Sequence, residues 1–288
     1  MNSSDPSHDQ VVRDEWHVLG ALEDLSARPD WDTRLLGEKV SIRRKAGNTF
    51  DVLGKDGATL QSQQRYGYLW ASLGTPARPL FAIPEFDEPD RRNLNAATFG
   101  VHVSAPRAIE NFLDMGHFPF VHTDYLGVEP HTEVKEYDVQ VTNDGHEVLA
   151  RRCRFYQPRA SSVAEQGYEV EYIYRVPHPY CAVLYKANAI DAARMDVIGL
   201  FLQPVDEEHV KANMLLSLID DASSDTTIRA FQQTIFAQDK PILENQIPLK
   251  LPLDPRAEMP AKSDASSITY RRWLRQRGVR YGTVAASA

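Results

Sequence analysis

Cysteine is scarce in this chain, with only Cys153 and Cys181 among its 288 residues. Two cysteines far apart in sequence argue against a disulfide framework and predict buried, apolar side chains in a reducing compartment, so we expect a cytoplasmic protein. Long apolar runs are also missing, because no stretch reaches the roughly 18 residues that a membrane-spanning helix requires. Residues 1–16 are polar and acidic, which argues against a secretory signal.

Positive charge is in the minority. The sequence holds 32 Lys and Arg against 40 Asp and Glu, a net charge of −8, which argues against general nucleic-acid binding. One basic cluster lies near the C-terminus, and its spacing predicts the solvated face of a terminal helix. A docking surface for an acidic redox partner is the alternative. The cluster consists of Arg271, Arg272, Arg275, Arg277 and Arg280.

Short β-type runs and turn signals dominate residues 1–74, which we expect to form a small β module. A linker follows over residues 75–95, because its four prolines forbid a regular helix or central strand. The β-type runs are Val40–Ile42, Phe50–Leu53 and Tyr66–Leu73, and the prolines are Pro76, Pro79, Pro84 and Pro89.

Residues 96–288 predict one larger domain. A helix is expected to start at Ser104 or Ala105 with Pro106 in its first turn, and a long helix to run from Asp225 to about Gln246. Between them, five runs rich in Val, Ile, Tyr and Phe are spaced like an antiparallel meander. These runs are Glu147–Tyr156, Tyr168–Arg175, Tyr180–Lys186, Met195–Gln203 and His209–Ile219.

The segment from Asn111 to His122 concentrates polar groups in an apolar setting. Asn111, Asp114 and His117 recur every three residues and would form one stripe on a helix. His117 and His122 would lie about 140° apart on a straight helix. A break caused by Pro119 could bring them together, and two imidazoles with one carboxylate form the facial triad of non-haem iron sites. Taken alone, such a histidine pair is more often part of an ordinary core or surface.

The wider pattern Asn-x2-Asp-x2-His-x4-His resembles the mononuclear-iron motif of Rieske non-haem iron oxygenase large subunits. The resemblance implies Fe(II) held by His117 and His122, with O2 as co-substrate. Residues 236–246 resemble the distal segment of that family, which makes Asp239 the third ligand; the alternative is that Asp239 is a solvated residue beside Lys240.

The same resemblance places Asp114 at the position of an electron bridge that also orients an imidazole. Asn111 is a further candidate for this surrounding shell. Gln246 follows Asp239 by seven residues, about two helical turns, and is therefore a candidate substrate contact.

A feature of the family is absent from this sequence. In relatives a Rieske domain precedes the catalytic domain and binds a two-iron cluster through Cys-x-His and Cys-x2-His pairs. Neither pair occurs here, so we expect no [2Fe-2S] cluster in this chain and electrons from a separate Rieske-cluster-bearing reductase that uses NAD(P)H. The implied fold is α+β: a curved antiparallel sheet around a long helix (a helix-grip-like catalytic domain), preceded by a truncated, cluster-free Rieske-like β module.

Two further patterns resemble the vanillate and methylxanthine demethylase branch: Gln-Asp-x4-Glu-x-Gln-x-Pro from Gln238, and Tyr270–Leu274. The resemblance is to cluster-free N7-demethylating subunits of bacterial caffeine breakdown. It implies conversion of 7-methylxanthine to xanthine and formaldehyde, a glutathione-transferase-like companion subunit, and a trimer or hetero-oligomer. The alternatives are a catalytically silent scaffold subunit, an O-demethylase acting on vanillate, and a ligand-binding module without metal.

Overall fold

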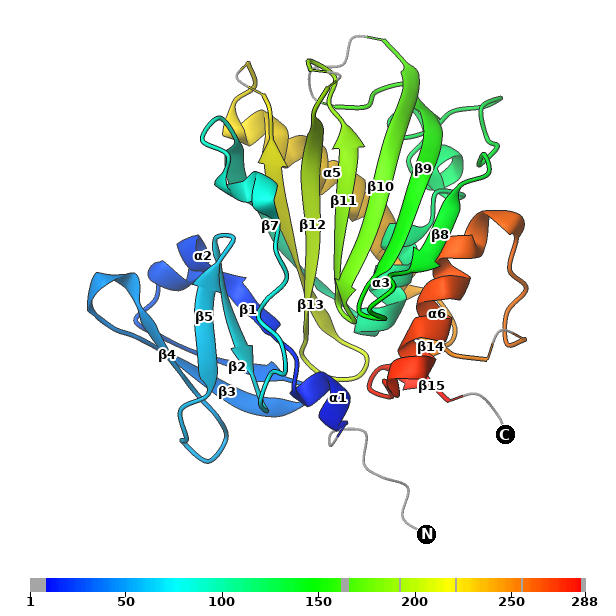
Figure 1. The fold of residues 1–288 in the computed structure, drawn as a ribbon. Coiled ribbons are helices and arrows are strands. Elements are labelled where there is room, and N and C mark those ends of the chain that lie inside the picture. Colours follow the sequence, from blue (N-terminus) through cyan, green and yellow to red (C-terminus); the bar gives the residue numbers. More distant parts are fainter. Residues whose placement is uncertain (1–8, 162–165, 192, 221, 255, 286–288) are drawn as a thin grey trace.

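The computed structural model describes residues 9–161, 166–191, 193–220, 222–254 and 256–285. The fold is built around a seven-stranded antiparallel sheet, with long helices behind it and smaller β-sheets in front and to one side (Figure 1). This arrangement confirms the predicted α+β class. None of the described helices combines the length and apolar character needed to cross a membrane.

The large sheet is an antiparallel meander of six strands, to which one earlier strand of the chain is added at the edge. Its order is β7-β13-β12-β11-β10-β9-β8, so β7 pairs with the last strand of the meander. The five strands predicted from the sequence correspond to β9–β13 and are confirmed. The strands are β7 (Arg92–Val101), β8 (Asp138–Val141), β9 (Val148–Gln157), β10 (Tyr168–His178), β11 (Cys181–Ala187), β12 (Met195–Pro204) and β13 (Val210–Leu218).

Both faces of this sheet are covered, which explains its nearly continuous apolar strands. Ile198 and Leu200 of β12 face the helices. Val197 and Phe201 face the other way and pack with Trp70 of the N-terminal β module, called the front module below. Alternate residues of one strand thus belong to two different cores, because side chains alternate across a sheet. Cys153 and Cys181 are both buried, as predicted.

The helices start where the sequence places them. Ser104 accepts a hydrogen bond from the Arg107 N–H at 3.4 Å and caps α3, and Ser224 accepts from the Thr227 N–H at 3.1 Å and caps α5. Phe236 of α5 stacks on the sheet at a ring separation of 4.5 Å from Phe99. The helices are α3 (Ala105–Leu113), α4 (Phe118–Val121), α5 (Asp225–Glu244) and α6 (Ala265–Arg277), accompanied by η4 (Lys262–Asp264), β14 (Leu251–Pro252) and β15 (Thr283–Val284).

The front module holds two three-stranded antiparallel sheets, ordered β1-β6-β5 and β2-β3-β4. The apolar runs in the sequence predict β3, β4 and β6 but not the other three strands. β5 reads Gln-Ser-Gln-Gln-Arg and lies at a sheet edge, where pairing rather than burial holds it, so it carries no apolar signal. The elements are α1 (Gln10–Arg13), β1 (His17–Ala21), α2 (Leu22–Ser26), β2 (Asp30–Leu35), β3 (Glu38–Arg44), η2 (Ala46–Asn48), β4 (Phe50–Leu53), β5 (Gln61–Arg65), β6 (Tyr68–Ser72) and η3 (Pro84–Asp87).

The C-terminal arginines only partly form the predicted solvated face. Arg272 and Arg275 are exposed on α6, but Arg271 binds Glu110 of α3 in a two-pronged ion pair at 2.5 and 2.8 Å. Arg277 pairs with Glu15 near the N-terminus. For these two arginines the prediction is wrong, because helical spacing does not reveal carboxylates that are supplied by distant segments.

A buried pair of histidines joins the front module to the large sheet. His17 of β1 and His178 of β10 are almost inaccessible, with ring centroids 5.2 Å apart. His17 Nε2 donates to the Val12 carbonyl at 2.6 Å, while His178 Nδ1 accepts from the Tyr180 N–H at 2.9 Å. Burial lowers the pKa of His17 to about 4 and that of His178 well below its usual value, so both rings are neutral at pH 7.

This neutral pair predicts an acid-sensitive fold. The contribution of neutral His17 to the free energy of unfolding is complete above pH 6.5. It is lost as the pH falls towards 4, because His17 is protonated in the unfolded chain before it can be protonated in the folded protein. In His17→Gln, which keeps a donor for the Val12 carbonyl, this loss is absent. We therefore expect its free energy of unfolding to fall by about 3 kcal/mol less than that of the wild type between pH 6.5 and pH 4. Urea unfolding at pH 7.5, 6, 5 and 4 measures the difference. The exposed Gln276 carries no titratable group and provides the control, since Gln276→Asn should follow the wild-type curve.

Candidate metal centre

The polar segment does not form one continuous helix. α3 ends before Asp114, whose backbone is extended (φ −83°, ψ 124°). The Asp114 carboxylate accepts a hydrogen bond from the Gly116 N–H at 2.7 Å, which closes a tight turn in place of another helical turn. The predicted stripe of Asn111, Asp114 and His117 on a single helix is therefore wrong.

Pro119 starts a new helical turn instead of ending the old one. It occupies the first turn of α4, where its missing N–H breaks no helical hydrogen bond. His117 and His122 flank this turn as its two caps, and the His122 N–H donates to the Phe118 carbonyl at 3.0 Å. The two imidazoles consequently converge, with ring centroids 5.0 Å apart.

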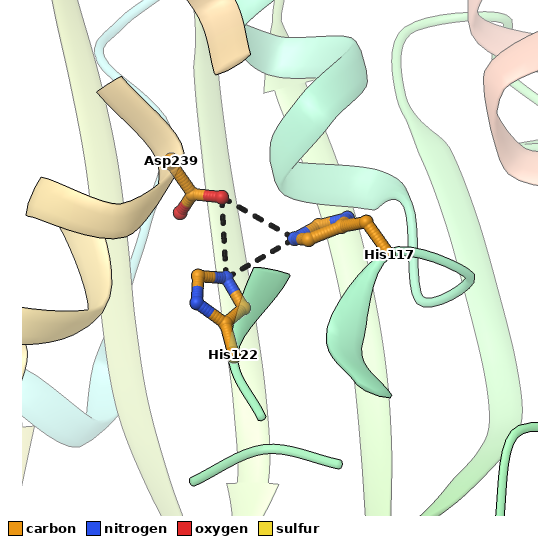
Figure 2. A group of neighbouring side chains, drawn as sticks. All are labelled: His117, His122 and Asp239. Atoms are coloured by element: carbon orange, nitrogen blue, oxygen red, sulfur yellow. Dashed lines mark hydrogen bonds and ion pairs between the residues drawn. The ribbon is translucent and has the colours of Figure 1, made fainter. Parts of the chain in front are cut away.

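Asp239 completes a compact group of three side chains. It projects from α5 towards both histidines, as Figure 2 shows. Its Oδ1 lies 3.3 Å from His117 Nε2 and 3.1 Å from His122 Nε2, and the two Nε2 atoms are 3.2 Å apart. Among the residues that the structure describes, no other group of three His, Cys, Asp or Glu side chains converges in this way.

The charges of this group are coupled. Burial alone would lower the pKa of His117, but the carboxylates of Asp114 and Asp239 outweigh it and raise that pKa to about 9. Burial likewise opposes ionisation of Asp239, yet its two histidine neighbours lower its pKa below the usual value. A carboxylate beside two nitrogen donors therefore stays ionised at neutral pH.

The three residues fit a divalent transition metal. Their ligand atoms form a near-equilateral triangle with edges of 3.1 to 3.3 Å. Atoms about 2.1 Å from one ion, on one octahedral face, lie about 3 Å apart. Asp239 Oδ1 is also buried without a hydrogen-bond partner among the described residues, as expected of an atom whose partner is a cation. Two imidazoles and one carboxylate are the donor set of mononuclear non-haem iron sites.

Each imidazole is held from behind by a second polar side chain. His117 Nδ1 lies 3.0 Å from Asp114 Oδ2, and His122 Nδ1 lies 2.8 Å from Gln238 Oε1. Both contacts place a proton on Nδ1, so the Nε2 atoms face the common centre and become ligand atoms once a metal displaces the proton that His117 carries there. Asp114 occupies the position predicted from the sequence. Gln238 was not predicted, because its only signal in the sequence is its place directly before Asp239.

A cavity between the large sheet and α5 opens onto the three side chains. Aromatic and aliphatic groups such as Phe118, Phe236 and Leu200 form most of its wall. Gln232 also lines it; this buried amide on α5 donates to the Met214 sulfur at 4.0 Å. Other polar groups also interrupt the wall. They include Asn111, Ser161, Tyr168, Tyr172, Tyr174, Lys186, Asn188, Asp196 and Asp220. Apart from Asn111, these residues were not predicted from the sequence, because they lie within strongly apolar segments.

A second cavity lies on the other side of His117 and has Asp114 in its wall. Gln246 lines this second cavity and not the first, because α5 ends at Glu244 and the two-turn spacing from Asp239 does not hold beyond it. The expectation that Gln246 faces the same cavity as Asp239 is therefore wrong, and its role as a substrate contact stays a prediction. Asn111 lines both cavities.

Comparison of the sequence and the fold with known proteins identifies the family of this chain. Residues 101–280 match the family described as vanillate O-demethylase oxygenase C-terminal domain. Over 277 residues, 96% of this chain and 98% of the relative, the sequence is 46% identical to the probable methylxanthine N7-demethylase NdmC of Pseudomonas sp. (strain TJI-51). It is also 27% identical to the methylxanthine N1-demethylase NdmA of Pseudomonas putida, over 74% of this chain and 59% of NdmA.

The structural match extends over more of NdmA than the sequence match does. The solved structure of NdmA from Pseudomonas putida CBB5 with caffeine superimposes with a TM-score of 0.75 at 20% identity, covering 94% of this chain and 92% of NdmA. At that identity the superposition supports the fold, whereas the family model and the 46% identity support the relationship. The chain therefore belongs to the Rieske non-haem iron oxygenases, in the branch that carries the vanillate O-demethylase oxygenase C-terminal domain.

Proposed function

We propose that this chain is the mononuclear-iron subunit of an oxygenase that removes an N-methyl group from a methylxanthine, with 7-methylxanthine as the best candidate. The observation that carries the proposal is the converged centre of two imidazoles and one carboxylate in a chain 46% identical to a probable methylxanthine N7-demethylase. The position of the methyl group rests on that relative. The products would be xanthine and formaldehyde.

His117, His122 and Asp239 would hold ferrous iron, which when bound supplies activation of O2 and oxygenation of the N-methyl carbon. The carbinolamine so formed loses formaldehyde, and the second oxygen atom leaves as water, so each turnover consumes two electrons and two protons. The chain contributes a largely apolar cavity that excludes water from the reacting methyl group. Gln232 lies seven residues before Asp239 on α5, and its amide is placed to bind a ring atom of the substrate.

Electrons would enter through Asp114. Its carboxylate binds the rear of an iron-ligating imidazole and also lines the second cavity, so it links that surface to the centre. Ile247 and Met259, both in the wall of this cavity, are more than nine-tenths exposed and offer apolar contact to a partner. We infer that a separate Rieske-cluster reductase using NAD(P)H docks here. A glutathione-transferase-like companion and a trimeric or hetero-oligomeric assembly belong to the same proposal.

O-demethylation of vanillate is the second candidate, and the matched family description favours it. A catalytically silent scaffold is less well supported, because a scaffold has no chemical need for three buried, converging polar side chains.

Formaldehyde release from singly methylated xanthines tests the proposal. Hydrogen peroxide can replace O2, electrons and protons together, so iron-loaded protein is assayed with peroxide on 1-, 3- and 7-methylxanthine and on vanillate. We expect the highest kcat/KM with 7-methylxanthine. Release from vanillate alone would make the protein an O-demethylase, and release from none of them, with the iron retained, would favour the scaffold.

A further inference from the structure

One row of polar side chains crosses the wall of the substrate cavity. Tyr172 of β10 is the direct cross-strand partner of Lys186 on β11, and Lys186 is the direct partner of Asp196 on β12. Directly opposed residues in antiparallel strands point to the same face. All three line the cavity that opens onto the metal centre.

Two aromatic rings connect this row to the metal centre. Lys186 Nζ sits 5.9 Å from the centre of the Tyr172 ring, and the Tyr172 and Phe118 rings are 6.3 Å apart. Phe118 in turn contacts the ring of His117 at 5.1 Å. Tyr172 and Phe118 therefore form one continuous stretch of wall between Lys186 and a metal-centre histidine, inside the cavity that would hold the ligand.

Lys186 carries a buried charge with few partners. Its side chain is 8% exposed, and among the described residues it donates one hydrogen bond, to the Ala160 carbonyl. It forms no ion pair within 4.0 Å with a carboxylate of those residues, and the attraction of Asp196 acts at longer range. The neighbouring Asp196 is engaged elsewhere, accepting from Asn188 Nδ2 and from the Ile219 N–H at 2.9 Å. An ammonium has three N–H donors, so this arrangement leaves donors for a ligand.

Two hydroxyls in the same wall point to the same conclusion. Tyr168 Oη and Ser161 Oγ are both buried, and neither has a hydrogen-bond partner among the residues described. Buried polar atoms in native proteins are nearly always paired, so unpaired ones in a cavity wall indicate a polar ligand. A ligand that satisfied these groups and Lys186 would have to present acceptor atoms.

We propose that Lys186 is a specificity-determining residue whose ammonium donates a hydrogen bond to a ring carbonyl oxygen of the substrate. The proposal rests on the proposed function, which supplies a ring system with two such oxygens. Lys186 then favours oxo-substituted heterocycles over analogues that lack the bound oxygen. It does not act on the methyl group itself.

Ligand analogues and one substitution test this role together. Dissociation constants are measured by calorimetry for 7-methylxanthine and for two analogues with one ring oxygen each, 7-methylhypoxanthine and 7-methyl-2-oxopurine. For the wild type we expect one analogue to bind about 10- to 100-fold more weakly than 7-methylxanthine, the usual effect of losing a charged hydrogen bond. Lys186→Met should weaken 7-methylxanthine by a similar factor and leave the affinity for that analogue nearly unchanged.

Lys211→Met is the matched control. Lys211 is also partly buried against an aromatic ring, with Nζ 5.0 Å from the centre of Trp31, but it lines neither cavity. Its substitution should leave all three dissociation constants unchanged. Equal affinities of the wild type for all three ligands would overturn the inference even if Lys186→Met failed to fold. Absence of methylxanthine binding by the wild type would instead overturn the proposed function, and the inference with it.

Discussion

Alanine at His117, His122 or Asp239 is expected to abolish iron binding and turnover together. Each removal leaves two ligands and an uncompensated polar cluster, since the three ligand atoms lie within 3.3 Å of one another. Loss of a group that merely orients a metal ligand costs about 10- to 100-fold in metal affinity, and loss of a ligand should exceed this. Iron per chain, measured after anaerobic loading and desalting, should fall from near one to near zero.

The control for this experiment is His209→Ala. His209 is exposed and paired with Asp206 on the surface, so it lies outside both cavities. It should keep wild-type iron content. Unchanged iron in His117→Ala, with the protein folded by circular dichroism, would contradict the assignment of the metal centre.

Asp114→Asn is expected to separate electron supply from chemistry. Turnover driven by a Rieske-cluster reductase and NADH should fall by roughly 100-fold or more, whereas peroxide-driven turnover, which needs no electron entry, should fall by roughly 10-fold or less. The reason is geometric: Asp114 both binds His117 Nδ1 and lines the second cavity, where the reductase is proposed to dock. The protein is loaded with excess iron, so that weaker binding does not limit either rate.

Gln238→Leu supplies the matched control for Asp114. Gln238 accepts a hydrogen bond from His122 Nδ1, as Asp114 does from His117 Nδ1, but Gln238 does not line the second cavity. Its substitution should lower the reductase-driven and the peroxide-driven rates by the same factor. If Asp114→Asn also lowered both rates equally, Asp114 would be a positioning residue and electrons would enter elsewhere.

Local patterns predicted the parts of this protein that depend on near neighbours. The capping serines of α3 and α5, and the apolar strands β9 to β13, could be placed because caps and burial leave signals within a few residues. The polar strand β5 could not, because its partner β6 supplies the stabilisation. The helix break was misplaced at Phe118, because the Asp114 turn that stops α3 is a side-chain interaction that spacing alone does not reveal.

The sequence by itself determined which side chains were available for chemistry. It supplies two imidazoles five residues apart and the Asp114 carboxylate three residues before the first of them, and it contains no Cys-x-His or Cys-x2-His pair for a cluster. Only the tertiary structure decided that Asp239 closes the triangle, that Gln238 rather than another group holds His122 across 116 residues of chain, and that Lys186 faces the same cavity. The physical reason is the range of each interaction. Helix and turn geometry act over a few residues, whereas contacts between distant segments depend on how the sheet curves and packs against α5.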